Sequence, residues 1–387
     1  MSRCVSNCAK ADGDPVSFFH VQPILSRLLA AVLGSLAPWA AAAALDTSPS
    51  GWHPFVEVRA WAGYDALAIG ELDGDWSGRF SPKSGRNVML RRNRAEIGVE
   101  NADWRLGWEV RQEANLIADR QTLEFIRRFK QRSAASGAAS AELAASFTMW
   151  SAQGPRLGRW FGPTASGWLP RVYLSGAIYT KATLRQEDVT GAVHYASADQ
   201  YDFNLRRTDA NSRYRYPFMQ HEPGASGASV SVAFAWRLSE AVSVDANIDD
   251  AWSAMRWRDL PVKEEQLNSQ VSTYDAQGYV DYQPLLSGTN RQLDRRGALG
   301  RSGGATLTYD FGPVSLAAGV QRLAGVSIPS VALARQFGWG KLTTRVETRF
   351  RSLGVAIDTG RFHLAVQTDS LRLGQAKALG ISAGVRY

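Results

Sequence analysis

Cysteine is almost absent from this chain of 387 residues, which contains only two. Both cysteines, Cys4 and Cys8, lie in an N-terminal segment that we expect to be removed. The remaining chain can form no disulfide, even in an oxidising compartment, and no cysteine-based zinc site. A large exported protein of this composition must be held by backbone hydrogen bonds and packing, and a closed β-barrel provides both by pairing every strand edge.

Long hydrophobic runs are also missing. The apolar run Leu28–Leu36 is too short to cross a bilayer as a helix. It follows Arg27 and precedes the small residues Ala40–Ala44, which is the order of a secretory signal peptide. We expect residues 1–44 to be cleaved as a signal peptide. Residues 45–387 contain no apolar stretch of about 18 residues, so we expect no helical membrane span in them. This leaves a soluble exported protein or a single β-barrel domain over residues 45–387.

Lysine is scarce too, since only seven of the 44 basic residues are lysines, and the formal net charge is +8. A basic chain could bind nucleic acid, but no basic helix or aromatic RNA-binding motif accompanies this charge. Together with the export signal, this leads us to expect no nucleic-acid partner. The chain also lacks the H-E-x-x-H zinc motif and a phosphate-binding glycine loop, and we expect no metal and no cofactor.

What the sequence does contain is alternation of apolar and polar residues with a period of two. In the stretch 94–100, Ala95, Ile97 and Val99 alternate with charged residues and a glycine. The last nine residues, Leu379–Tyr387, alternate in the same way and end on an aromatic, as a strand that closes an outer-membrane barrel does. Short turns join such stretches at 101–103, 239–240, 312–313 and 358–360.

We therefore predict an all-β fold, a transmembrane antiparallel up-and-down β-barrel of about 14 strands, within a range of roughly 12 to 16. The short turns would lie at the periplasmic end. Because Tyr387 must then end at the periplasmic rim, counting back makes 339–358 one strand with a β-bulge near Arg351. Long extracellular loops are predicted at 67–87, 119–141, 209–225, 257–302 and 324–338.

One segment near 119–132 has helical rather than strand periodicity. Leu123, Ile126 and Phe129 follow at helical spacing, and Asp119 precedes them as an N-cap. We predict a short amphipathic helix within a long loop. Folded inward, this helix would narrow the pore; the alternative is a surface helix that rests on the rim.

Aromatic residues near the short turns occupy the alternate strand positions whose side chains face outward. Such residues form a girdle at the membrane interface. The predicted girdle consists of Trp104, Trp236, Phe311, Phe362 and Tyr387.

The other alternate strand positions carry charged side chains, which would line the lumen and set its ion preference. An arginine-rich lumen indicates a weak preference for anions, because arginine keeps its charge and binds anions in a fork. The alternative is a plugged barrel whose charges neutralise one another. The predicted lumen residues are Arg92, Arg94, Glu96, Glu100, Arg105, Glu109, Arg111, Glu113, Arg237, Arg345, Glu347, Arg349 and Arg351.

No residue is predicted to be catalytic. Gly380–Gly384 fits the G-x-S-x-G pattern, but that pattern requires a sharp strand-to-helix turn, and here it lies within a straight strand. A barrel hydrolase that uses His194 or His221 is a remaining alternative without a convincing triad.

Three short pieces of the chain resemble known families. The hairpin Phe311–Val314 resembles turns of general porins from Gram-negative β-proteobacteria, and Leu90–Glu100 with Asp103-Trp104 resembles the early hairpin of phosphate-selective porins. The terminal strand is similar to the assembly signal of outer-membrane barrels, although it ends in Tyr387 where phenylalanine is usual. The resemblance implies a porin, recognition of the last strand by the barrel-assembly machinery, and a homotrimer as one possible oligomeric state. It supplies no phosphate-site residue.

These observations together predict a porin-like channel in the Gram-negative outer membrane, in contact with outer-membrane lipid and lipopolysaccharide. It would pass small hydrophilic solutes by passive diffusion, with a weak preference for anions. The alternative is a closed barrel that acts through its long loops in surface binding, adhesion or assembly.

Overall fold

The computed structural model describes residues 51–72, 74–131, 139–163, 169–197, 200–269, 272–274, 280–282 and 285–387. The expected signal peptide, residues 1–44, lies outside this part of the chain. Among the described residues, no helix is long and apolar enough to cross a membrane.

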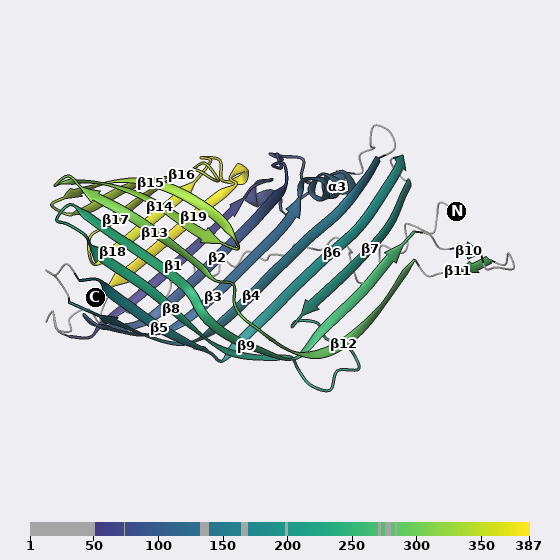
Figure 1. The fold of residues 1–387 in the computed structure, drawn as a ribbon, viewed down its shortest axis with the longest axis horizontal. Coiled ribbons are helices and arrows are strands. Elements are labelled where there is room, and N and C mark those ends of the chain that lie inside the picture. The colour runs from purple at the N-terminus through teal and green to yellow at the C-terminus, as the bar shows by residue number, and fades with distance from the viewer. Residues whose placement is uncertain are drawn as a thin grey trace.

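The described strands form one closed antiparallel β-barrel, as the alternation predicted (Figure 1). Seventeen strand segments join in one sheet. Three pairs of consecutive segments each continue along one line of the wall, so that the barrel has 14 strands. The segments are β1 His53–Tyr64, β2 Arg86–Glu100, β3 Trp104–Asp119, β4 Ala139–Phe161, β5 Arg171–Tyr179, β6 Lys181–Ser197, β7 Gln200–Asn211, β8 Gly224–Arg237, β9 Val242–Asn268, β12 Leu286–Gly297, β13 Ser302–Asp310, β14 Val314–Leu323, β15 Val326–Phe337, β16 Gly340–Glu347, β17 Ser352–Asp358, β18 Phe362–Thr368 and β19 Ala378–Arg386.

Five small elements lie outside this wall. The helix α3 spans Arg120–Gln131, and two short 3₁₀ turns span Ile69–Glu71 (η2) and Leu373–Gln375 (η3). The strands β10 (Ser272–Tyr274) and β11 (Val280–Tyr282) form a separate two-stranded sheet.

The barrel closes between its first and last strands. β1 pairs with β2 along one edge and with the C-terminal strand β19 along the other, with Phe55 opposite Arg386. The alternating C-terminal stretch therefore belongs to a paired strand, and closure removes the two sheet edges that would otherwise be left open.

On β3, residue parity separates an apolar outer face from a charged inner face. On β3, Leu106 and Trp108 point outward and are 47% and 43% exposed, whereas Arg111 and Glu113 point into the lumen and are buried. Exposed large apolar side chains on the outside of a closed barrel are expected where lipid surrounds the wall.

Three strands of the wall are interrupted at a similar height. β5 continues into β6 past Thr180, β7 into β8 past residues 212–223, and β12 into β13 past residues 298–301. β9 runs beside two of these breaks and has 27 residues, with left-handed backbone at Asp250 (φ 52°) and Asp259 (φ 51°).

The predicted helix forms, and Asp119 caps it as expected, because its Oδ1 accepts a hydrogen bond from the Thr122 backbone N–H at 2.6 Å. Leu123 packs with Leu116 and Phe147, which belong to the outward faces of β3 and β4. The helix therefore rests on the outer side of the wall and does not narrow the lumen.

Several sequence predictions about the wall are wrong. Residues 339–358 are not one bulged strand but the hairpin β16–β17, with a turn at 348–351. The predicted loop 324–338 is strand β15, and much of the predicted loop 257–302 belongs to β9 and β12. The predicted count of about 14 strands is nevertheless confirmed.

The predicted separation of short turns at one end of the barrel from long loops at the other is only partly present. Short turns at 101–103, 311–313 and 359–361 lie at the end where the chain terminates (Figure 1). The connection 65–85 and helix α3 lie at the opposite end, but so do the tight turns at 324–325 and 348–351. The wall is consequently tall on the side of β4, β6 and β9 and short on the side of β14–β18.

Candidate functional site in the barrel lumen

A layer of ion pairs crosses the lumen near mid-height. The Arg92 guanidinium donates to Glu113 Oε1 through Nη2 at 2.7 Å and through Nε at 3.1 Å. Its Nη2 also donates to Ser302 Oγ at 2.6 Å, which joins β2 to the beginning of β13. Arg111 Nη2 donates to the same Glu113 oxygen at 2.7 Å, and the Arg111 fork binds both carboxylate oxygens of Asp250.

A second group of charges lies below this layer, toward the short-turn end. Glu109 is fully buried and accepts from Arg94 and Arg156, each at 2.6 Å, and from the Tyr179 hydroxyl at 3.1 Å. A buried carboxylate persists only when it is paired in this way. Arg105 binds three further carboxylates, those of Glu57, Glu96 and Glu100, at 2.8–3.2 Å.

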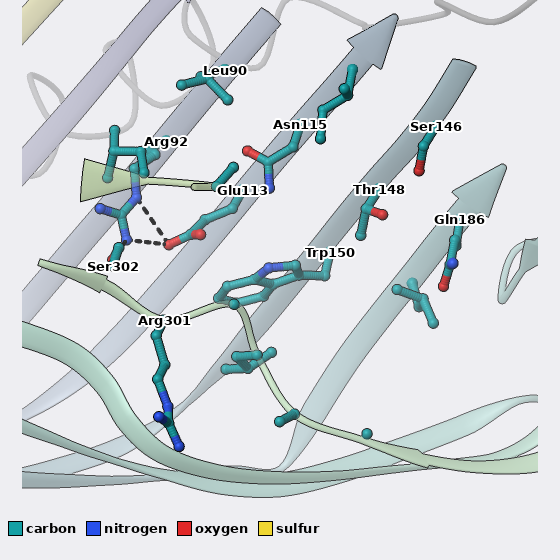
Figure 2. Close-up of a pocket in the computed structure, with 18 of the residues that line it drawn as sticks. Leu90, Arg92, Glu113, Asn115, Ser146, Thr148, Trp150, Gln186, Arg301 and Ser302 are labelled. Carbon is teal, nitrogen blue, oxygen red and sulfur yellow. Dashed lines mark hydrogen bonds and ion pairs between the residues drawn. The ribbon is translucent and has the colours of Figure 1, made fainter. Parts of the chain in front are cut away.

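The half of the lumen away from the short-turn end contains a cavity of about 330 Å³, the outer cavity, which lies above the ion-paired layer. Figure 2 shows the Arg92–Glu113 pair and Ser302 at one side and Trp150 beside them. Asn115, Ser146, Thr148 and Gln186 line the cavity from β3, β4 and β6. Residues Ala298–Arg301, which interrupt the strand β12–β13, also line it.

The half of the lumen nearer the short-turn end contains a larger cavity of about 960 Å³, the inner cavity. Eight arginines and six carboxylates line it, together with His363. Arg92, Glu113 and Leu323 line both cavities, so the two spaces meet at the ion-paired layer.

Most predicted lumen residues lie on the inner face. Arg92, Arg94, Glu96, Glu100, Arg105, Arg111, Glu113, Arg345 and Glu347 line the inner cavity, and Glu109 lies buried among them. Arg345 forms no close ion pair among the described residues and donates to Ser330 Oγ at 2.9 Å.

Three predicted lumen residues are placed differently. Arg237 is exposed at the short-turn end and donates to the Glu240 backbone oxygen at 3.0 Å. Arg349 and Arg351 belong to the turn between β16 and β17, because the single bulged strand does not exist. Arg349 pairs there with Asp65 at 2.6 Å, and Arg351 has left-handed backbone (φ 56°).

The five residues predicted as a girdle lie at the short-turn end of the wall. Trp236, Phe311 and Phe362 are exposed on the outer face, and Trp104 and Tyr387 are partly exposed. Sequence reasoning missed several neighbours of the same kind, including Tyr309, whose ring centroid lies 4.5 Å from that of Phe311.

Several residues that shape the lumen were not predicted. Asp250, Arg156 and Tyr179 were missed because their strands were bounded wrongly or weakly patterned. Trp150 and Trp257 were missed because an inward aromatic in a barrel gives no signal apart from its parity. Trp257 is 5% exposed, and its indole N–H has no hydrogen-bond partner among the described residues.

The histidines considered for a hydrolase form no complete triad in the described part of the chain. His194 Nδ1 lies 3.0 Å from Ser140 Oγ, but no described carboxylate is hydrogen-bonded to the ring. His221 lies in the segment between β7 and β8, where its backbone oxygen accepts from Gln292.

At the outer rim, Lys377 fastens the connection between β1 and β2. Its Nζ donates to the backbone oxygens of Asp65 and Ala66 and to Ser81 Oγ at 2.6 Å. Burial is the main cause that lowers the pKa of Lys377 to about 8, and the nearby Arg79 acts in the same direction.

No protein-family model matches the chain, and no curated protein matches it in sequence. Solved structures that are similar to this one include the TodX deltaS2S3 mutant monoaromatic hydrocarbon channel. It is 12% identical to this chain, the match covers 88% of this chain and 90% of that chain, and the TM-score is 0.41. The toluene transporter TbuX of Ralstonia pickettii is 9% identical, with 87% and 89% covered at a TM-score of 0.30. The CymD monoaromatic hydrocarbon channel is 11% identical, with 88% and 90% covered at 0.26. None of these comparisons confirms the resemblance to general or phosphate-selective porins.

Proposed function

We propose that this chain is an outer-membrane channel that passes small polar solutes by diffusion, with a weak preference for anions. The observation that carries the proposal is the alignment of two cavities, about 330 and 960 Å³, within one closed barrel. Only the layer around Arg92 and Glu113 separates them. An apolar outer face and the export signal predicted for residues 1–44 support insertion in the outer membrane.

The charge of the lumen supports the anion preference. The inner cavity has eight arginines against six carboxylates, and the outer cavity has three arginines against one carboxylate. A hydrocarbon, which the similar structures are described as passing, gains little from such a lining. A solute that carries negative charge finds donors along the whole route.

The second candidate is a closed barrel that acts through its outer surfaces. It is favoured by the ion-paired layer, because fully paired charges can seal a lumen as well as line it. Flux of solutes into proteoliposomes separates the two candidates. A channel gives swelling in small anionic solutes that exceeds swelling in cations of equal size. A sealed barrel gives the rate of protein-free liposomes.

A further inference from the structure

The outer cavity presents a row of polar side chains that the ion-paired layer does not use. Asn115, Thr148 and Gln186 are direct neighbours in the register of β3, β4 and β6. Neither the Asn115 amide nor the Thr148 hydroxyl has a partner among the described residues, while Gln186 donates to Asp188 at 3.1 Å. Figure 2 shows this row along one side of the cavity. The row can therefore bond to a bound molecule.

Beside this row the cavity is apolar and aromatic. Trp150 is 5% exposed and lies next in register between Glu113 and Leu184. Leu90, Leu184 and Leu323 line the cavity as well, together with Trp257. An indole face accepts a second ring in stacked or edge-to-face contact. Surfaces of this kind suit an apolar ring, because its carbon surface loses no hydrogen bonds to water when it is buried against the leucines.

The cavity also has positive charge that no protein carboxylate neutralises. Arg295 and Arg301 have no ion-pair partner among the described residues, whereas the single carboxylate, Glu113, already binds Arg92 and Arg111. Figure 2 shows Arg301 extending away from Glu113. An anionic group bound on this side would meet guanidinium donors without approaching Glu113.

We propose that the outer cavity is a binding site for a small aromatic carboxylate. The ring contacts Trp150, and the carboxylate faces Arg295 and Arg301 at the edge of the cavity. A volume of about 330 Å³ lies at the lower end of known ligand pockets, which suits a one-ring compound. The site deepens the proposed channel function, since it names the class of solute that the lumen selects.

Calorimetric titration of the full chain in detergent micelles tests the site, with benzoate as the probe. Benzyl alcohol and benzylamine carry the same ring with neutral and positive groups. We expect benzoate to bind at one site about tenfold more tightly than benzyl alcohol, because a charge-assisted pair is added, and benzylamine to bind no better than the alcohol.

The double variant Arg295→Gln with Arg301→Gln should weaken benzoate about tenfold, to the level of benzyl alcohol, without changing the binding of the alcohol. Arg296→Gln is the matched control, since Arg296 is the next residue on β12 but does not line the cavity. It should leave benzoate binding unchanged.

The proposal is overturned if benzoate does not bind, if all three probes bind alike, or if Arg296→Gln costs as much as the double variant. Conductance of the same preparations separates this result from the channel proposal. Conductance without benzoate binding rejects the site alone, and benzoate binding without conductance rejects the channel alone.

Discussion

Arg111 on β3 and Asp250 on β9 form a bidentate ion pair across the lumen, with N–O distances of 2.9 and 2.8 Å. Asp250 is fully buried and adopts a left-handed backbone (φ 52°), which residues other than glycine rarely do. Its backbone N–H donates to Ser231 Oγ at 3.1 Å. The pair therefore joins β3 to β9 across the lumen and holds the ion-paired layer in place.

Asp250→Asn should loosen this layer. Asparagine tolerates left-handed backbone but removes one charge of a buried pair, a change that costs about 3–5 kcal/mol of stability. We expect a lower urea midpoint together with higher single-channel conductance, because Arg111 is no longer held from the β9 side. Asp294→Asn, at an exposed pair with Arg256, is the control and should change neither. A destabilised variant with unchanged conductance would show that the pair is structural only.

Glu113→Gln should increase the preference for anions. The substitution removes the carboxylate that neutralises both Arg92 and Arg111, so two guanidinium groups gain positive potential where the cavities meet. Reversal potentials in a KCl gradient should shift toward the chloride equilibrium value. Glu264→Gln, at an exposed pair with Arg291, serves as the control. A shift toward potassium would contradict the assigned role of this layer.

Val331→Arg should be far more costly than Ala332→Arg, although the positions are adjacent. Val331 is on the outer face and 49% exposed, whereas Ala332 lies opposite Arg345 on the inner face. An arginine that faces lipid near the bilayer centre costs about 2–4 kcal/mol. Unfolding in lipid vesicles measures both variants. Equal costs would mean that the outer face of β15 is not in contact with lipid.

Lys377→Met should abolish one component of the pH dependence of stability. The pKa of Lys377 is about 8 in the folded protein, against an ordinary value of 10.5. Between these values the unfolded chain binds more protons, so the contribution of this residue to the free energy of unfolding rises with pH. Below pH 8 both states are protonated, and the buried charge reduces stability.

Urea unfolding at about pH 7 and about pH 9.5 checks this sign. The wild type should gain stability relative to Lys377→Met at the higher pH. A constant difference between the two proteins would show that the amine keeps its charge throughout.

The sequence predicted the class of fold, because alternation directly reports which side chains face lipid. It failed where a turn lacked its usual residues. The turn 348–351 is Thr-Arg-Phe-Arg, with Arg351 rather than glycine in the left-handed position (φ 56°), so the break in parity resembled a bulge. Strand β15 contains Pro329 and follows the tight turn at Ala324 and Gly325, and both features are typical of a loop rather than of a strand.

Less of the candidate site than of the fold could be predicted from the sequence. Parity placed Arg92, Arg111 and Glu113 in the lumen, but it could not pair Arg111 with Asp250, 139 residues away. That pairing depends on which strands face each other across the barrel and on a bulge in β9. The outer cavity likewise requires the break at 298–301, which brings Leu299 in contact with residues of the inner face.

Planar-bilayer recording with the purified, folded protein is the most direct test of the channel. The account predicts discrete ion-permeable events whose reversal potential in a salt gradient indicates a modest preference for chloride. A protein that inserts, shows the heat-modifiable migration of a folded barrel and conducts no ions would contradict it.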